Sequence, residues 1–279
     1  MTPSTSSSPT GAPTAMVTGA SRGIGRGVAI ALAEAGFDVA VTARTVHEDD
    51  PLAVDPDTDV RLPGSLDATA AEIERFGRRA VPIRLDLLDQ AALAPAVDEA
   101  VEQLGRLDLL VNNAVYVGPG GQRRFLDSEP DELANRVFGN ITAQLLLTQR
   151  AVTHMVGAGG GLVIDISSAA GQYTPRQPVG EGGWALSYAV TKAGFHRLAD
   201  MLALECGDAG IRAFNLNPGF VATERVLAVE ELAFVAERGI APAIVGQVVA
   251  WFATSGHEQF ANGTYHQVPD LARELGLVP

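Results

Sequence analysis

Two residues whose types and spacing suggest proton chemistry are Tyr188 and Lys192, which lie four positions apart near the start of a helix-like stretch, Ser187–Ala209. Side chains four apart share one face of a helix, so the phenol and the ammonium are neighbours. A nearby positive charge stabilises a phenolate and lowers its pKa from about 10 toward neutral pH. Such a tyrosine can exchange a proton with an alcohol or carbonyl oxygen. A buried tyrosine beside a surface lysine is the alternative.

The composition of the basic residues singles out the same lysine. Lys192 is the single lysine among 20 basic side chains, and the others are arginines. Arginine can replace lysine on most solvated surfaces, but not where a compact ammonium on a flexible stem is required. We therefore interpret Lys192 as a functional residue.

A glycine-rich turn follows the first apolar run, Ala15–Thr18, and precedes a helical stretch, Ile24–Ala35. Its glycines, Gly19, Gly23 and Gly25, let the backbone turn tightly and approach a pyrophosphate, whose charge then faces the N–H groups of the helix. A strand before the turn and a helix after it make this a predicted dinucleotide-binding loop. A purely structural strand–helix turn is the alternative.

The end of the second apolar run, Phe37–Thr42, indicates which nucleotide is bound. An acidic side chain there would hold the adenosine ribose and favour NAD, and Ala43 cannot do so. Arg44, assisted by Arg22, can pair with a 2′-phosphate, which favours NADP. An acidic segment begins two residues later, and its carboxylates could repel that phosphate or bind the ribose. NADP is the preferred prediction and NAD the alternative.

Two further strand ends carry candidate cofactor residues. Asp86 follows the third apolar run and can accept a hydrogen bond from the adenine amine, unless it is a solvated loop acid. Asn112, Asn113 and Ala114 follow the fourth run, where asparagine side chains can tie the loop to the cofactor ribose, unless they form a plain turn.

Apolar runs of strand length alternate with helical stretches along the chain. This pattern is typical of a parallel sheet covered by helices on both faces. It predicts an α/β protein, a single-domain Rossmann fold with a doubly wound parallel sheet over residues 15–279, after a disordered tail, 1–14. The expected strands are Ala15–Thr18, Phe37–Thr42, Ala80–Leu85, Leu107–Val111, Gly161–Ile166, Ile211–Leu216 and Gly263–Val268; the expected helices are Ile24–Ala35, Leu66–Phe76, Ala91–Leu104, Glu132–Met155, Ser187–Ala209 and Pro242–Thr254.

Three insertions depart from this alternation. The segment 46–65 is acidic and rich in proline, the segment 171–183 is rich in glycine and proline, and the segment 224–239 has helical spacing. Long loops in compact domains are usually functional or disordered. All three follow strands at the edge where open α/β sheets bind ligands, so we expect them around the site.

Charge and composition exclude several other classes of protein. A net charge of −13 with no basic tract argues against binding to nucleic acid or to an anionic membrane surface. One cysteine, Cys206, excludes an intrachain disulfide framework, and the five histidines lack metal-ligand spacing, so no metal is expected. The sequence also lacks an apolar run of membrane-spanning length, a targeting segment and a serine-hydrolase elbow. We expect a cytoplasmic enzyme.

Taken together, these motifs resemble the short-chain dehydrogenase/reductase family from Ala15 to about Val268. The resemblance implies that Tyr188 is the proton donor and acceptor, and that Lys192 holds the nicotinamide ribose and lowers the tyrosine pKa. It also implies that Ser168 hydrogen-bonds the substrate oxygen, with Ser167 as the alternative, and that Asn140 holds a water in the proton relay. The residues that carry the resemblance are Thr18–Gly25, Asn112–Ala114, Asn140, Ile166–Ser168, Tyr188–Lys192, Asn217–Gly219 and Thr223.

The resemblance also implies a loop over the nicotinamide, from Pro218 to Thr223, and a homodimer or homotetramer. The insertion ending in Leu62-Pro63-Gly64 resembles a subgroup with a long loop at that place. Two departures from the family pattern are the 20 positions between Ser168 and Tyr188, where about a dozen are usual, and the missing glycine pair near the C-terminus. The predicted cofactor-binding residues are Gly19, Ser21, Arg22, Gly23, Ile24, Gly25, Arg44, Asp86, Leu87, Asn113, Ala114, Tyr188, Lys192, Pro218, Gly219, Val221 and Thr223.

The sequence therefore predicts an NADP(H)-preferring oxidoreductase that moves hydride between nicotinamide and a small-molecule carbonyl or secondary alcohol. One alternative is an NAD-dependent alcohol dehydrogenase of the same family. The other is a non-catalytic nicotinamide-binding sensor or scaffold, which would need the glycine loop but not Asn140, Ser168, Tyr188 and Lys192 together. No residue pattern indicates the identity of the substrate.

Overall fold

A seven-stranded parallel sheet forms the centre of the molecule in the computed structural model, which describes residues 11–229 and 232–278. The strand order is β3-β2-β1-β4-β5-β6-β7, so the chain starts in the middle, winds outward to one edge and then outward to the other. The predicted doubly wound Rossmann fold is confirmed. The strands are β1 (Thr14–Thr18), β2 (Asp38–Ala43), β3 (Ala80–Arg84), β4 (Leu109–Asn112), β5 (Gly161–Ile166), β6 (Ile211–Asn217) and β7 (Tyr265–Gln267).

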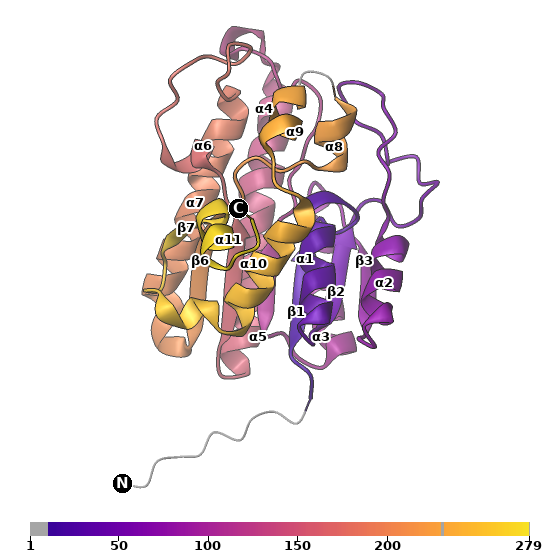
Figure 1. The fold of residues 1–279 in the computed structure, drawn as a ribbon, viewed down its shortest axis with the longest axis vertical. Coiled ribbons are helices and arrows are strands. Elements are labelled where there is room, and N and C mark those ends of the chain that lie inside the picture. The colour runs from indigo at the N-terminus through magenta and orange to yellow at the C-terminus, as the bar shows by residue number, and fades with distance from the viewer. Residues whose placement is uncertain (1–10, 230–231, 279) are drawn as a thin grey trace, which may run out of the picture.

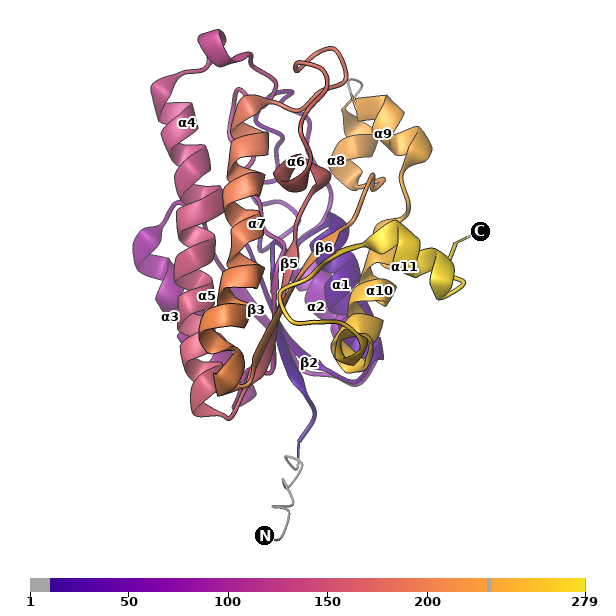
Figure 2. The same cartoon turned by 90° about the vertical axis from the view of Figure 1, so that its left-hand side faces the viewer.

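Helices cover both faces of the sheet, as Figure 2 shows with the sheet between two helical layers. One layer holds α3, α5 and α7, and the other holds α1, α2 and α10. The helices are α1 (Gly23–Glu34), α2 (Leu66–Arg75), α3 (Gln90–Leu104), α4 (Pro130–Val137), α5 (Ala143–Gly157), α6 (Ala169–Gln172), α7 (Leu186–Cys206), α8 (Glu224–Ala228), α9 (Ala233–Arg238), α10 (Pro242–Thr254) and α11 (Val268–Glu274).

Each strand sends alternate side chains into two separate apolar cores. In β1, Ala15 and Val17 belong to the core under α1 and α10, whereas Met16 belongs to the core under α3 and α5. This alternation follows from the two-residue period of a strand. The continuous apolar runs of the sequence therefore mark strands buried on both faces.

The expected helix Glu132–Met155 is divided in the structure. Between α4 and α5 the backbone forms one π-helical turn, Phe138–Thr142, which contains Asn140. A π turn inserts an extra residue into a helix and is frequent at functional sites. The sequence pattern predicted one continuous helix here and did not indicate the turn.

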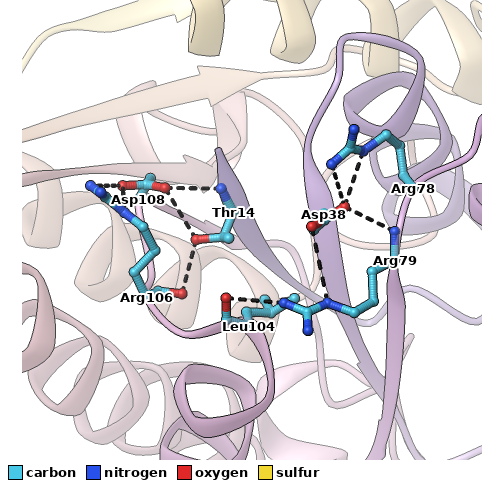
Figure 3. Close-up of polar contacts among 7 residues, drawn as sticks. All are labelled: Thr14, Asp38, Arg78, Arg79, Leu104, Arg106 and Asp108. Atoms are coloured by element: carbon cyan, nitrogen blue, oxygen red, sulfur yellow. Dashed lines mark hydrogen bonds and ion pairs between the residues drawn. The ribbon is translucent and has the colours of Figure 1, made fainter. Parts of the chain in front are cut away.

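The amino ends of the strands are fastened by carboxylates (Figure 3). Asp38, at the start of β2, accepts hydrogen bonds from Arg78 at 2.7 Å and from the backbone of Arg79 at 2.9 Å. Asp108, before β4, accepts one from the backbone N–H of Thr14 at 2.9 Å. These contacts connect β2 to the start of β3, and β1 to the start of β4, at the edge remote from the expected site.

The opposite, carboxyl edge carries the three insertions, which gather at the top of the molecule in Figure 1. The segment 46–65 follows β2, the segment 171–183 follows β5 and α6, and the segment 224–239 forms α8 and α9. Residues 1–10 of the expected tail and residues 230–231 of the third insertion lie outside the described residues. The insertions therefore lie at the sheet edge where the sequence places the ligand.

Candidate active site

A cavity of about 440 Å³ opens at the carboxyl edge of the sheet. Cofactor and small-molecule sites typically have volumes of about 300–1,000 Å³. All but three of the predicted cofactor residues line it. The lining members are Gly19, Ser21, Arg22, Gly23, Ile24, Arg44, Asp86, Leu87, Asn113, Ala114, Tyr188, Lys192, Pro218 and Thr223.

The three predicted residues that do not line the cavity are Gly25, Gly219 and Val221. A Cβ atom at Gly25 would lie 2.2 Å from the carbonyl oxygen of Gly19, so this glycine is needed for close packing inside the loop. Gly219 has a φ of +67°, which favours glycine, and Val221 is buried.

Asn113 fixes the glycine loop from the end of β4. Its side-chain amide donates to the carbonyl oxygens of Thr18 at 2.8 Å and Gly19 at 3.2 Å. The hydroxyl of Thr18 in turn accepts from the backbone N–H groups of Asn113 and Ala114, both at 3.0 Å. The loop is thereby held in shape with the N-terminus of α1 facing the cavity.

One end of the cavity is lined by Tyr188 and Lys192 on α7 and by Ser167, which lies just after β5. Burial raises the pKa of the Tyr188 phenol, and the hydroxyl of the neighbouring Ser168 lowers it. Ser168 caps α6 by accepting from the backbone of Ala170 at 3.2 Å. Ser167 pairs with His196 at 3.0 Å, so Ser168 is the serine whose hydroxyl acts on the tyrosine.

The Lys192 ammonium is nearly inaccessible to solvent, with 8% of the residue exposed. Its Nζ donates to the main-chain carbonyl oxygen of Ile166 at 2.8 Å. Burial lowers the pKa of Lys192 to about 8, and the nearby carboxylate of Asp165 opposes that change. The ammonium is therefore directed toward the end of β5, in the same region as the Tyr188 hydroxyl.

Asn140 lies behind these residues, and its side chain makes two hydrogen bonds to the backbone of Tyr116. It accepts from the Tyr116 N–H at 2.6 Å and donates to the Tyr116 carbonyl at 3.1 Å. A second cavity, of about 10 Å³, lies between Asn140, Gln144, Tyr188 and Lys192. Its volume is about that required for one water molecule.

Gln144 supplies a polar group to that small cavity. Its amide N–H₂ group is engaged by the carbonyl oxygens of Ala114 at 3.1 Å and Gly139 at 3.2 Å. Its Oε1 is buried and has no partner within the described part of the chain. A buried acceptor of this kind is suited to a donated hydrogen bond from water.

At the other end of the cavity, Arg22 is already bound by the protein. Its guanidinium donates to the carbonyl oxygens of Leu62, Pro63 and Gly64 in the first insertion, at 2.8–3.3 Å. Burial lowers the pKa of Arg22; the charges of Glu224 and Glu48 oppose that change, and the charge of Arg44 adds to it. Both arginines line the cavity, and the Arg22 guanidinium is occupied by these carbonyl oxygens. Arg44 is therefore the predicted ligand of a 2′-phosphate, with Arg22 close by.

Sequence reasoning missed the residues that close this end. Asp55 lies in the first insertion and is fully buried, and its carboxylate accepts from Arg225 of α8 at 2.5 Å. Glu224, also in α8, accepts from the backbone N–H of Gly23 at 2.8 Å. The acidic composition of 46–65 indicated charge in this region but not which carboxylate meets which arginine. Additional cavity residues from the two insertions are Leu52, Val54, Asp55, Pro56, Leu62, Glu224, Arg225 and Val226.

Among residues 11–229 and 232–278, no group of three or more histidine, cysteine or carboxylate side chains is placed to hold a metal ion. Within the same residues, no helix is both long and apolar enough to cross a membrane.

Comparison with known proteins agrees with this geometry. A family model described as "short chain dehydrogenase" matches residues 13–54 and 60–231. L-rhamnose 1-dehydrogenase (NAD(P)(+)) from Sphingomonas sp. (strain SKA58) is 34% identical over 197 residues, which are 70% of this chain and 67% of that protein.

Solved structures give the same result over more of the chain. Carveol dehydrogenase from Mycobacterium avium, in complex with NAD, superposes with a TM-score of 0.77 at 25% identity, covering 93% of this chain and 96% of that one. Acetoin dehydrogenase from Salmonella typhimurium superposes with a TM-score of 0.73 at 26% identity, covering 92% and 94%. These proteins share one fold and are named for different substrates.

Proposed function

This chain belongs to the short-chain dehydrogenase family, and from that premise we propose that it is an NADP(H)-preferring oxidoreductase acting on a carbonyl or secondary alcohol, with Tyr188 as the general acid and base. The observation that carries the proposal is that Tyr188 and Lys192 line one end of a cavity of cofactor size, with the Ser168 hydroxyl acting on the Tyr188 phenol. A binding module without turnover would need the glycine loop but not this constellation.

The residues present fit a nicotinamide dinucleotide. Gly19 has a φ of +69°, and a Cβ atom there would lie 2.8 Å from the Cα atom of Ala114, so the loop keeps its backbone bare toward the cavity. The N-terminus of α1 offers N–H groups and a positive dipole end to a diphosphate. When bound, the nicotinamide supplies or accepts the hydride.

The substrate oxygen is proposed to lie between the hydroxyls of Ser168 and Tyr188. Ser168 orients that oxygen, and Tyr188 donates its proton in reduction or accepts one in oxidation. The positive charge of Lys192 stabilises the phenolate form of Tyr188 and so favours loss of its proton. Val115 and Val117, which line the cavity beside these groups, give the substrate an apolar wall.

Replacement of the Tyr188 proton is proposed to occur through the small cavity behind it. A water there can accept a hydrogen bond from the Lys192 ammonium and donate one to Gln144 Oε1, the buried oxygen that has no partner among the described residues. Asn140 contributes by fixing the loop at Tyr116 and by breaking the helix at the π turn. Its two bonds to Tyr116 leave one amide N–H available, so Asn140, which lines the small cavity, is proposed to help hold the water there.

The preference for NADP is proposed on the charge of the adenosine end. Ala43 offers no carboxylate to the ribose, and Arg44 lines the cavity where a 2′-phosphate would be placed. The acidic residues of the first insertion are partly neutralised, because Asp50 pairs with Arg84 and Asp55 pairs with Arg225. A cytoplasmic homodimer or homotetramer remains the expectation from the sequence.

The test is NADPH oxidation against a panel of ketones, aldehydes, quinones and ketoacyl thioesters, run with wild type and Tyr188→Phe. We expect turnover to fall by about 10²–10⁴-fold in the variant, the usual contribution of general acid–base catalysis. The NADPH affinity, measured by fluorescence, should stay within about twofold, because the phenyl ring still fills its place. Equal turnover in both proteins would contradict the assignment of Tyr188.

A further inference from the structure

Asp165 is a fully buried acid to which the proposed reaction gives no role. It lies in β5, and its strand neighbours Ile164 and Ile166 point into the core under α1 and α10. Since strand side chains alternate, the carboxyl of Asp165 points to the other face, beneath α5 and α7. A carboxylate in an apolar strand interior is costly unless it is paired or hydrogen-bonded.

Uncharged polar groups hold this carboxyl in place. The register of the sheet puts Asn112 of β4 and Asn215 of β6 directly beside Asp165. The amide of Asn112 donates to Asp165 Oδ1 at 2.9 Å and to the hydroxyl of Thr148 on α5 at 2.8 Å. The other oxygen, Oδ2, has no hydrogen-bond partner among the described residues.

The nearest positive charge is that of the single lysine. Lys192 extends from α7, which packs on the same face of β5, and its Nζ donates to the carbonyl oxygen of the residue next to Asp165, Ile166. The other groups that face the ammonium are the Phe195 ring at 5.2 Å and the Tyr188 phenol. From α5 and the π turn come only Gln144 and Asn140, which carry no charge.

The opposite charges of Asp165 and Lys192 also stabilise each other. The charge of Lys192 lowers the pKa of Asp165, which burial raises to about 7, and the charge of Asp165 raises that of Lys192, which burial lowers to about 8. Asp165 is the one charged group among the described residues that affects the lysine in this way. A buried ammonium without a counter-charge would lose its proton more readily.

We propose that Asp165 is a positioning residue that acts through Lys192: its buried carboxylate, held by Asn112, is the counter-charge that keeps the ammonium protonated beneath the active site. The role of that ammonium in the reaction rests on the proposed function, but the pairing does not. The consequence is that the charge state of the proton relay depends on a residue that touches neither substrate nor cofactor.

The test uses the fact that the chain has one lysine. In the full-length protein, lysine labelled with ¹³C and ¹⁵N gives the NMR resonances of one lysine side chain. Their pH titration reports the protonation of Lys192 directly and without a substrate. We expect the titration midpoint to fall by at least one pH unit in Asp165→Asn, which keeps the shape and the acceptor for Asn112. An unchanged midpoint in the folded variant would overturn the proposal.

Two more variants keep this test decisive. Thr148→Val is the matched control, since it removes a buried hydroxyl from the same cluster without changing charge, and its midpoint should stay at the wild-type value. Asn112→Ala serves if Asp165→Asn does not fold; it removes the donor that stabilises the carboxylate, so the midpoint should fall in the same direction by a smaller amount. A midpoint equal to wild type in that variant would count against the proposal.

Turnover gives a separate readout. In Asp165→Asn the alkaline limb of the pH profile for carbonyl reduction should move to lower pH by the same amount as the lysine midpoint. A uniform loss at every pH would indicate a structural defect and overturn the proposed role. If the wild type has no turnover on any substrate, the proposed function fails, and the lysine titration still decides the pairing.

Discussion

The two ends of the cavity are assembled in different ways. At the nicotinamide end, Ser168, Tyr188 and Lys192 come from the end of β5 and the first turns of α7, close together in sequence. At the adenosine end, Asp55 meets Arg225 across 170 positions, and Gly23 meets Glu224 across 201 positions. The comparison teaches that the residues proposed for the chemistry lie at short spacings in the sequence, whereas the adenosine end is closed by contacts between segments far apart in it.

The largest effect is expected at the nicotinamide end, in Lys192→Arg. The guanidinium keeps the positive charge but is planar and larger than an ammonium. The Lys192 Nζ contacts the Ile166 carbonyl oxygen and the Phe195 ring, and Lys192 lines the small cavity, so there is little room for the larger group. We expect turnover to fall by about 100-fold or more, within the range for a lost proton-transfer group. The measurement is steady-state NADPH oxidation, with circular dichroism to establish that the variant is folded. Turnover within a factor of three of wild type would mean that charge alone suffices at this position.

The next effect belongs to the adenosine end, in Arg44→Ala. Hydrogen bonds to charged groups contribute about 1.5–3 kcal/mol, so NADPH affinity should fall by about 10- to 100-fold. NADH affinity should stay within about twofold, because no 2′-phosphate is present to be lost. Fluorescence titration with both nucleotides measures the ratio. Equal losses for the two nucleotides would contradict the NADP preference and favour the NAD-dependent alternative.

Glu224→Gln should have a smaller effect, and in the opposite direction. The Glu224 carboxylate accepts from the N–H of Gly23, at the helix terminus that is suited to a diphosphate. A neutral amide would no longer repel an incoming phosphate, so we expect NADPH and NADH to bind about three- to tenfold more tightly. The measurement is the salt dependence of both affinities, which should be weaker in the variant. Weaker binding of both nucleotides would instead show that Glu224 holds the site in its binding shape.

The same contrast explains what could be predicted from the sequence. Strands buried on both faces appear as continuous apolar runs, so the order and bounds of the sheet elements were predictable to within one or two residues. Tyr188 and Lys192 were predictable because helix geometry converts a spacing of four into proximity. Asp165 also left a signal, an acid within the apolar run Gly161–Ile166, although the sequence alone does not say which cation it faces.

Other features leave no signal in residue types. Arg22 was predicted to assist with a 2′-phosphate, and its guanidinium is bound by three backbone carbonyls of residues 62–64, which any sequence would offer. The π turn at Phe138–Thr142 falls within the stretch Glu132–Met155, which the sequence pattern predicted as one continuous helix. Contacts such as Asp55 with Arg225 depend on how two insertions fold against each other, and local spacing carries no information about that.

A last comparison concerns the pH dependence of stability, which distinguishes the two ends by sign. Burial raises the folded-state pKa of Asp165 from its ordinary value of 3.8 to about 7. A group whose pKa is raised on folding contributes stability below the unfolded value that is lost as the pH rises through the folded value. At the adenosine end, burial raises the pKa of Asp55, but the hydrogen bond and charge of Arg225, together with hydrogen bonds from Asp57 and Thr58, outweigh it, so the pKa of Asp55 is lowered. Its contribution is therefore present above 3.8 and lost at more acidic pH.

Melting curves of wild type and Asp165→Asn between pH 4 and 6.5 test this difference. Relative to the variant, the wild type should lose stability as the pH rises across this window. The lowered pKa values of His196 and His266 act in both proteins and cancel in the comparison. One pKa unit is worth about 1.4 kcal/mol, and about 1 kcal/mol moves the melting temperature of a chain of this size by roughly 2–4 °C. Parallel melting curves would mean that Asp165 ionises as freely in the folded protein as in the unfolded chain, which would contradict the raised pKa that distinguishes the nicotinamide end.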